Sequence, residues 1–161
     1  MNPELVIDHQ LRPGDIGYLI HLHGKRYAAE NGYLQGLEIY TMESMLESLK
    51  NFSPDKDRFW IARQGDTIVG SIALVNRGEL AQLRYFLIEP EYRGYGLGNQ
   101  FMQLFVAFMH TCGYQGAYLW TTNELPAAAH LYRKFGFVLT EEVSSQQFGK
   151  QTIEQKYELR Y

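Results

Sequence analysis

A glycine-rich stretch at residues 93–98 has the residue types and spacing of a phosphate-binding loop. It reads RGYGLG, with glycine at every second position, and it leads into an apolar helical pattern. The first N–H groups of a helix have no partner within the helix and carry partial positive charge. Because glycine has no Cβ, a phosphate can come close to these N–H groups. The stretch therefore predicts a site for a phosphate or a pyrophosphate.

Two other kinds of phosphate loop do not fit these residues. A P-loop needs Gly-Lys-Ser/Thr, and this combination is absent here. A dinucleotide-binding fingerprint needs a third glycine at the position that Asn99 occupies. Such a fingerprint should also follow an early strand rather than three antiparallel ones. The loop therefore belongs to another class of phosphate-binding site.

A second segment, AAAHLYRKFGF at residues 127–137, indicates which class this is. Together with the loop, it resembles the GNAT superfamily of N-acetyltransferases, whose motifs read Arg-x-x-Gly-x-Gly and Ala-x-x-Leu-Tyr-x-Lys-x-Gly-Phe. The resemblance implies an enzyme that moves an acetyl group from acetyl-coenzyme A to a primary amine by direct attack, without a metal. The amine would belong to a small molecule, an amino acid or a peptide. A non-catalytic sensor of acyl-coenzyme A is the alternative.

The resemblance also implies roles for particular residues. Tyr132 matches the family's general acid, and its hydroxyl can hydrogen-bond to the departing thiolate. The backbone of the preceding strand is expected to lie along the pantetheine, where one N–H group polarises the thioester carbonyl. The residues expected to contact coenzyme A are Phe86, Leu87, Ile88, Arg93, Gly94, Tyr95, Gly96, Leu97, Gly98 and Asn99.

The base that accepts the proton of the amine is harder to assign. Some relatives carry a carboxylate on the strand after the long helix, but residues 119–122 (LWTT) contain none. Glu79 lies in the turn before the strand expected over 80–88, and it is the candidate that we place in the site. Glu30 and Glu38 are further candidates. A chain of water molecules with no single base is an alternative.

The acceptor site is expected at the first two helices, because in this family their connection forms its wall. Residues 21–40 are rich in tyrosine and contain acids. An aromatic, acid-containing pocket suits a cationic amine, whereas Arg84 suits a carboxylate. The expected acceptor contacts are Glu30, Tyr33 and Arg84, with Trp60 facing the same cleft. Together they favour an amino acid or the end of a peptide.

Composition and charge argue against several kinds of partner. The 161 residues carry a formal net charge of −3, and the 15 Lys and Arg residues are scattered, so we expect no nucleic acid partner. No apolar run approaches the ~18 residues of a membrane span. The single cysteine, Cys112, leaves no internal disulfide and suits the cytoplasm. His21 and His23 point to different sides of a helix, so we expect no metal site there.

Hydrophobic periodicity predicts one GNAT-like domain over residues 1–161, of the α/β (α+β) class. Helices are expected over 14–31, from a cap at Thr41 to before Pro54, over 97–112 and over 126–135. Strands are expected over 4–9, 58–64, 67–76, 80–88, 117–122, 137–145 and 151–160. The order β-α-α-β-β-β-α-β-α-β-β describes a mixed, mostly antiparallel sheet of about six or seven strands with helices on both faces.

Two further expectations depend on the family. Residues 11–33 and 119–137 resemble the acetyltransferase half of bacterial proteins that fuse a MarR-type regulator to such a domain. With 161 residues, the chain is expected to act alone, without a DNA-binding half. An exposed last strand is expected to allow a homodimer.

Overall fold

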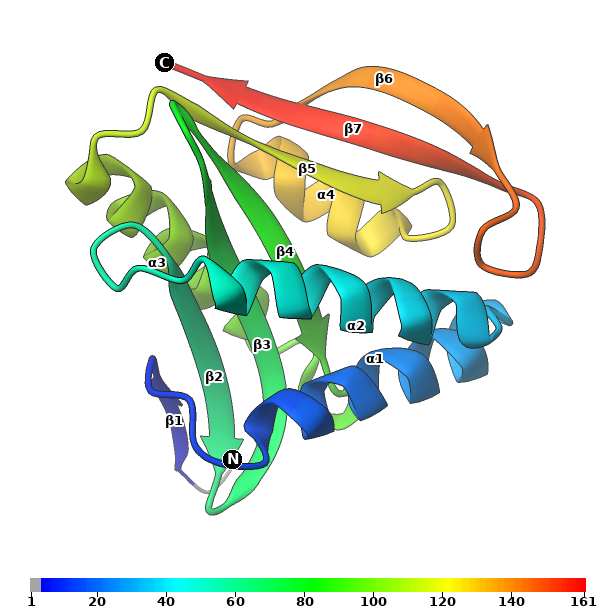
Figure 1. Ribbon diagram of the computed structural model, residues 1–161, viewed down its shortest axis with the longest axis horizontal. Helices are drawn as coiled ribbons and strands as arrows, with labels where there is room; N and C mark the ends of the chain where they lie inside the picture. The colour runs from blue at the N-terminus through cyan, green and yellow to red at the C-terminus, as the bar shows by residue number, and fades with distance from the viewer. Residues whose placement is uncertain (1–3) are drawn as a thin grey trace.

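A computed structural model describes residues 4–161, so residues 1–3 of the expected domain lie outside the described part. The helices and strands follow the predicted order (Figure 1). In chain order they are β1 (Leu5–Asp8), α1 (Asp15–Asn31), α2 (Gln35–Lys50), β2 (Arg58–Gln64), β3 (Thr67–Arg77), β4 (Leu80–Ile88), the 3-10 helix η1 (Pro90–Tyr92), α3 (Leu97–Cys112), β5 (Gly116–Thr122), α4 (Pro126–Lys134), β6 (Val138–Ser145) and β7 (Thr152–Arg160).

The seven strands form one sheet in the order β1-β2-β3-β4-β5-β7-β6. All neighbouring pairs are antiparallel except β4 and β5, which run parallel. Helices α1 and α2 cover one face of the sheet, and α3 and α4 cover the other (Figure 1). Each face has its own apolar cluster, because β2, β3 and β4 bury side chains on both sides. In residues 4–161, no helix combines the length and apolarity needed to cross a bilayer.

The central feature of the sheet is the early separation of β4 from β5. The two strands pair only between residues 80–82 and 116–118. Beyond this point β4 continues to Ile88 and β5 to Thr122, and the two strands diverge (Figure 1). Because neither strand has a partner on this side, backbone groups of β4 and β5 face the opening between them.

A β-bulge in β4 lies beside this opening. Ala73 pairs with Arg84 and Ser71 pairs with Leu87, so Tyr85 and its neighbour together oppose a single residue of β3. Tyr85 has a φ of 54°, which is uncommon for a residue other than glycine. The Ser71 hydroxyl donates a hydrogen bond of 2.6 Å to the Tyr85 carbonyl and holds the bulge in place.

The bulge reverses the alternation of side chains along β4. Before it, Leu83 belongs to the cluster under α3, and Arg84 reaches Tyr40 on α2. After it, Phe86 packs on the α3 side, whereas Leu87 belongs to the cluster under α1 and α2. Two successive residues, Arg84 and Tyr85, therefore face the α1–α2 layer.

Helix α2 begins at Gln35, so the predicted cap at Thr41 was wrong. Thr41 lies inside the helix, where its hydroxyl donates to the Leu37 carbonyl at 2.8 Å. The helix starts early because Leu34 donates a backbone hydrogen bond of 2.8 Å to the Phe148 carbonyl, between β6 and β7. A Cβ on Gly36 would lie 2.2 Å from the Gln147 carbonyl oxygen, so this glycine allows close packing and does not break the helix.

The expectation of an exposed last strand was also wrong. Strand β7 lies between β5 and β6 and pairs with both, so it has no free edge. Strand β6 is the edge of the sheet, and Val138 and Val143 on it are 63% and 46% exposed. Chain order and sheet order differ here because the last two strands form a hairpin whose second strand joins β5.

Candidate active site

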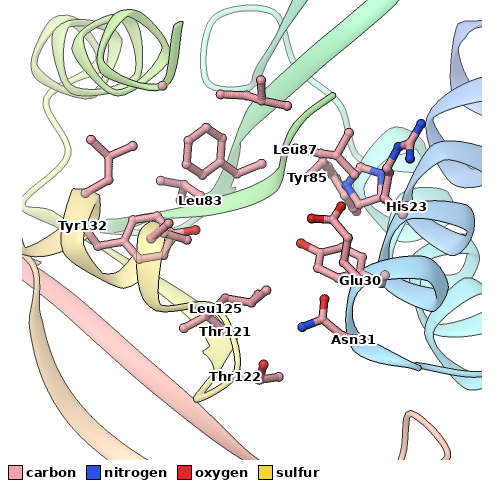
Figure 2. Close-up of a pocket in the computed structure, with 18 of the residues that line it drawn as sticks. His23, Glu30, Asn31, Leu83, Tyr85, Leu87, Thr121, Thr122, Leu125 and Tyr132 are labelled. Atoms are coloured by element: carbon pink, nitrogen blue, oxygen red, sulfur yellow. The ribbon is translucent and has the colours of Figure 1, made fainter. Parts of the chain in front are cut away.

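A cleft of about 770 Å³ opens where β4 and β5 separate. Figure 2 shows Tyr132 of α4 on one side of the cavity and His23, Tyr85 and Glu30 on the other. The predicted site residues that line it are Phe86, Leu87, Ile88, Arg93, Gly94, Gly96, Leu97, Gly98, Asn99, Tyr132, Glu30, Tyr33 and Arg84. These residues come from four regions of the chain, 30–33, 84–88, 93–99 and 132, and they meet where the two strands separate.

The glycine loop forms an open cradle at the start of α3. Gly94 and Gly96 have φ angles of 85° and 86°, a backbone conformation that favours glycine. Apart from the neighbouring residues in the chain, no heavy atom of residues 4–161 lies within 4 Å of where a Cβ on either glycine would stand. No side chain caps α3, so its first N–H groups keep their hydrogen-bonding capacity. Open space, bare backbone and free donors fit a diphosphate.

The third glycine of the loop has a different purpose. A Cβ on Gly98 would lie 3.1 Å from Leu131 Cδ2 and 3.6 Å from Ile88 Cδ1. Gly98 therefore lets α3 approach both α4 and the end of β4. The close approach of these elements places the start of α3 beside the opening of the sheet.

Two bidentate ion pairs connect α1 to the segment that follows β4. Arg26 holds Glu89 through contacts of 2.7 and 2.8 Å, and Arg93 holds Glu30 through contacts of 2.6 and 3.0 Å. Arg93 also donates to the Ile88 carbonyl at 2.8 Å. Its hydrogen bonds lower the pKa of Glu30, so this carboxyl group stays ionised and already has a cationic partner.

Tyr132 projects into the cleft from the apolar side of α4. Its side chain is 5% exposed, and its ring lies about 6 Å from the rings of Phe86 and Tyr157. Burial raises the pKa of its hydroxyl, which therefore remains a proton donor at neutral pH. Within residues 4–161 the hydroxyl has no hydrogen-bond partner, and Figure 2 shows it directed at the cavity. It is therefore available to a bound molecule.

Aromatic rings form the wall of the cleft beyond Tyr132. Tyr33 stacks on Tyr27 at 5.9 Å and on Phe148 at 5.3 Å, and Tyr40 meets Phe148 edge-on at 5.7 Å. The Tyr33 hydroxyl lies 2.7 Å from the Thr122 hydroxyl at the end of β5. These contacts hold α1, α2, β5 and the β6–β7 loop together around one pocket.

Residues 55–139, more than half of the chain, match the family model described as the acetyltransferase (GNAT) domain. The chain belongs to the GNAT acetyltransferase family. The matched region includes the glycine loop, β4, β5 and α4, and therefore one side of the cleft; α1, α2 and the β6–β7 loop lie outside it. No match was found among curated proteins.

Solved structures share the GNAT fold over nearly the whole chain, and the predicted fold class is confirmed. Spermidine N-acetyltransferase from Vibrio cholerae, solved with CoA and spermine, is 21% identical with a TM-score of 0.68, and the match covers 99% of this chain and 97% of that one. PaiA N-acetyltransferase from Thermoplasma acidophilum, solved with coenzyme A, is 19% identical with a TM-score of 0.72, over 99% and 100%. An acetyltransferase of the GNAT family from Staphylococcus aureus is 16% identical with a TM-score of 0.74, over 98% and 99%.

Three predicted positions lie away from the cleft of this GNAT domain. Glu79 is exposed in the β3–β4 turn, at the opposite end of β4 from the glycine loop, so its carboxyl group does not reach the site. Tyr95 is 68% exposed and does not line the cleft. Trp60 is buried against Phe108 of α3, on the other face of the sheet. Strand β2 is buried on both faces, so its sequence could not show which way Trp60 points.

Sequence reasoning missed several residues of the cleft, and Phe148 and His23 are two of them. Phe148 comes from the β6–β7 loop, and no local pattern connected it with α1 and α2. His23 is 5% exposed and lines the cleft, with Nδ1–H donating to the Leu19 carbonyl at 2.7 Å. Its Nε2 atom is buried and has no partner in the described part of the chain. The helical pattern around His23 indicated burial, but not that it borders a cavity.

His23 should make the protein sensitive to acid. Burial lowers its pKa to about 4, whereas the unfolded chain takes up this proton near pH 6.5. The contribution of neutral, buried His23 to the free energy of unfolding is complete above pH 6.5. It is lost as the pH falls towards 4, and the loss is on the order of 3 kcal/mol. In urea unfolding at pH 7.5 and 4.5, His23→Gln should therefore lose less stability between the two pH values than the wild type.

The control for this prediction is His21→Gln. His21 lies on the same helix but is exposed, so its replacement should leave the acid sensitivity unchanged. An equal loss of stability in His23→Gln and the wild type would show that another group takes up the proton.

Proposed function

We propose that this GNAT protein transfers an acetyl group from acetyl-CoA to a primary amine of a small molecule, an amino acid or a peptide. The observation that carries the proposal is a single cleft that contains both an uncapped helix start on a bare glycine loop and the unpartnered hydroxyl of Tyr132. The first feature fits a diphosphate and the second fits a leaving thiolate. No nucleic acid or membrane enters this proposal.

The chain's own groups suit the binding of coenzyme A. The cradle of residues 94–99 would hold the diphosphate, with Arg93 at its edge. The side of β4 that faces β5, from Phe86 to Ile88, offers backbone groups that no strand engages. When bound, acetyl-CoA supplies the acyl group. Tyr132 would donate its hydrogen bond at the sulfur, and a free N–H of β4 would lie at the carbonyl oxygen.

The reaction also needs a group that accepts the proton of the attacking amine. Glu79 lies outside the cleft, and Glu38 does not line it. Glu30 lines it but is held by Arg93 through both carboxylate oxygens. None of the three predicted candidates is therefore both in the cleft and unpaired, and we assign this proton to water in the cleft, the alternative that the sequence left open.

Release of free thiol from acetyl-CoA, measured with a panel of primary amines, tests the proposed function. We expect release that depends on the amine and that is strongly reduced in Tyr132→Phe. Tight binding of coenzyme A without thiol release from any amine would instead favour the alternative, a sensor of acyl-coenzyme A. Failure to bind coenzyme A at all would reject both functions.

The proposal also covers the domain organisation, the location and the oligomeric state of the protein. The likeness to the acetyltransferase half of MarR-type fusions, over residues 11–33 and 119–137, suggests an acetyltransferase domain that acts in the cytoplasm. A homodimer would now have to use the free edge of β6 or another surface, because β7 is paired on both sides. Light scattering that finds one chain per particle would reject the dimer.

A further inference from the structure

We propose that the acceptor amine also carries a carboxylate, and that Arg84 binds this group. The inference rests on the proposed function and names the class of amine that the same cleft takes. It starts from the charges along the cleft. Three arginines line it, and two of these, Arg26 and Arg93, are each engaged by a glutamate through both oxygens. Within residues 4–161, Arg84 has no carboxylate partner.

Neighbouring side chains hold the Arg84 guanidinium without neutralising it. Its Nη2 donates to the Tyr40 hydroxyl at 3.0 Å. The guanidinium lies 5.5 Å from the centre of the Tyr40 ring and 5.4 Å from that of Tyr85. On α2, Glu47 is already occupied by Arg77, with contacts of 2.6 and 3.0 Å. The remaining donors of Arg84 form a planar fork that matches a carboxylate.

The β4 bulge determines where this charge stands. Because the alternation reverses at Tyr85, Arg84 and Leu87 both face the α1–α2 side of the cleft. Leu87 lies three positions after Arg84, which corresponds to a distance of ~10 Å along β4. A carboxylate at Arg84 would therefore sit several bonds away from an amine near the end of the strand. This spacing favours ω-amino acids or the side-chain amine of an amino acid.

The carboxylates that line the cleft give less support to a polyamine as the acceptor than Arg84 gives to an amine with a carboxylate. Glu30 is paired with Arg93, and Glu124 is paired with Lys150 at 2.8 Å, although one Glu124 oxygen has no partner. Glu154 is the one cleft-lining carboxylate without a cation partner in the described residues, and the Gln147 amide donates to it. A diamine would therefore find one carboxylate without a cation partner among the described residues.

The test compares amines that differ only in the charge at their far end. For each chain length from two to six carbons, it uses an alkylamine, the ω-amino acid and the diamine, and measures kcat/KM for thiol release. For the best length, we expect the amino acid to exceed the alkylamine by ~10- to 100-fold, as for a charge-assisted hydrogen bond. Arg84→Gln should remove this advantage, so that the ratio of amino acid to alkylamine falls to about one.

Glu154→Gln is the matched control. It removes the opposite charge from the same cleft and should leave the ratio of amino acid to alkylamine unchanged. The proposal is overturned if no length favours the amino acid, if the diamine is the best acceptor, or if Arg84→Gln lowers all three classes equally. In each of these results thiol is still released, so the proposed function stands.

If no thiol is released, a binding measurement tests the role of Arg84 separately from the proposed function. Calorimetry with the N-acetylated form of each ω-amino acid tests Arg84 without any turnover. We expect saturable binding to the wild type, weakened by ~10-fold or more in Arg84→Gln. Equal affinity in the two proteins, or binding to neither, would overturn the role of Arg84.

Discussion

Replacing Gly96 with alanine should weaken the binding of coenzyme A by ~10- to 100-fold while the protein still folds. At a φ of 86°, the backbone strain of an alanine costs about 1–2 kcal/mol. No protein atom lies within 4 Å of the new methyl group. The methyl group would instead enter the space in which we place the diphosphate, between the bare backbone and the free N–H groups of α3. Calorimetric titration with coenzyme A measures the effect.

Gly113 provides a matched control at the other end of the same helix. It caps the C-terminus of α3 with a φ of 76°, and a Cβ there would also meet nothing within 4 Å. Gly113→Ala should therefore lose a similar amount of thermal stability and keep its full affinity for coenzyme A. If the two variants bind coenzyme A equally well, the diphosphate does not lie at residues 94–99.

Replacing Tyr132 with phenylalanine should lower kcat by about 100-fold, because a positioned general acid typically contributes 10²–10⁴-fold. The change removes a hydroxyl that has no partner in residues 4–161 and leaves the packing of the ring on Phe86 intact. The affinity for coenzyme A and the melting temperature should therefore change little. Steady-state kinetics, calorimetry and thermal unfolding on the same preparation separate these effects.

The neighbouring Tyr157 is the control for this substitution. It is fully buried, and its ring lies 6.0 Å from that of Tyr132, but its hydroxyl accepts a hydrogen bond of 2.9 Å from Arg133. Tyr157→Phe should therefore cost some stability and leave kcat close to that of the wild type. A Tyr132→Phe enzyme with unchanged kcat would remove Tyr132 from the chemistry.

The pH profile provides a second view of Tyr132. Because burial raises the pKa of its hydroxyl, the acid form should persist beyond pH 10, the ordinary value for tyrosine. The rate should therefore not fall between pH 8 and 10 through loss of this proton. The ionised Glu30, whose pKa Arg93 lowers, should add no step near neutral pH either.

Much of the fold and the coenzyme A side of the proposed site was predictable because its signals are local. Strands β2 and β4 and helix α3 have the predicted bounds, because alternating or helical apolar patterns end at turn residues and glycines. The glycine loop and the segment 127–137 carry their information in consecutive residues. Their proximity was decided by the tertiary structure, in which Gly98 permits α3 to pack against Leu131.

The acceptor side of the site was less predictable from the sequence, because it depends on contacts between residues far apart in the chain. A bulge of one residue at Tyr85 decides that Arg84 and Leu87 face the same side of the cleft, and nothing in the alternation of β4 predicts a left-handed residue there. Trp60 was misplaced because a strand buried on both faces has no distinguishing pattern. Glu30 was expected to be free, but Arg93, 63 residues away, occupies it.

The sequence by itself therefore determined the family, the order of helices and strands, and the cradle at residues 93–99, because short-range periodicity and backbone preferences set these features. Only the tertiary structure decided which charges of the cleft remain unpaired, that Glu79 lies outside it, and that Phe148 and His23 border it. Ion pairing, burial and the direction of a side chain are properties of neighbours in space. They follow from how the sheet opens between β4 and β5.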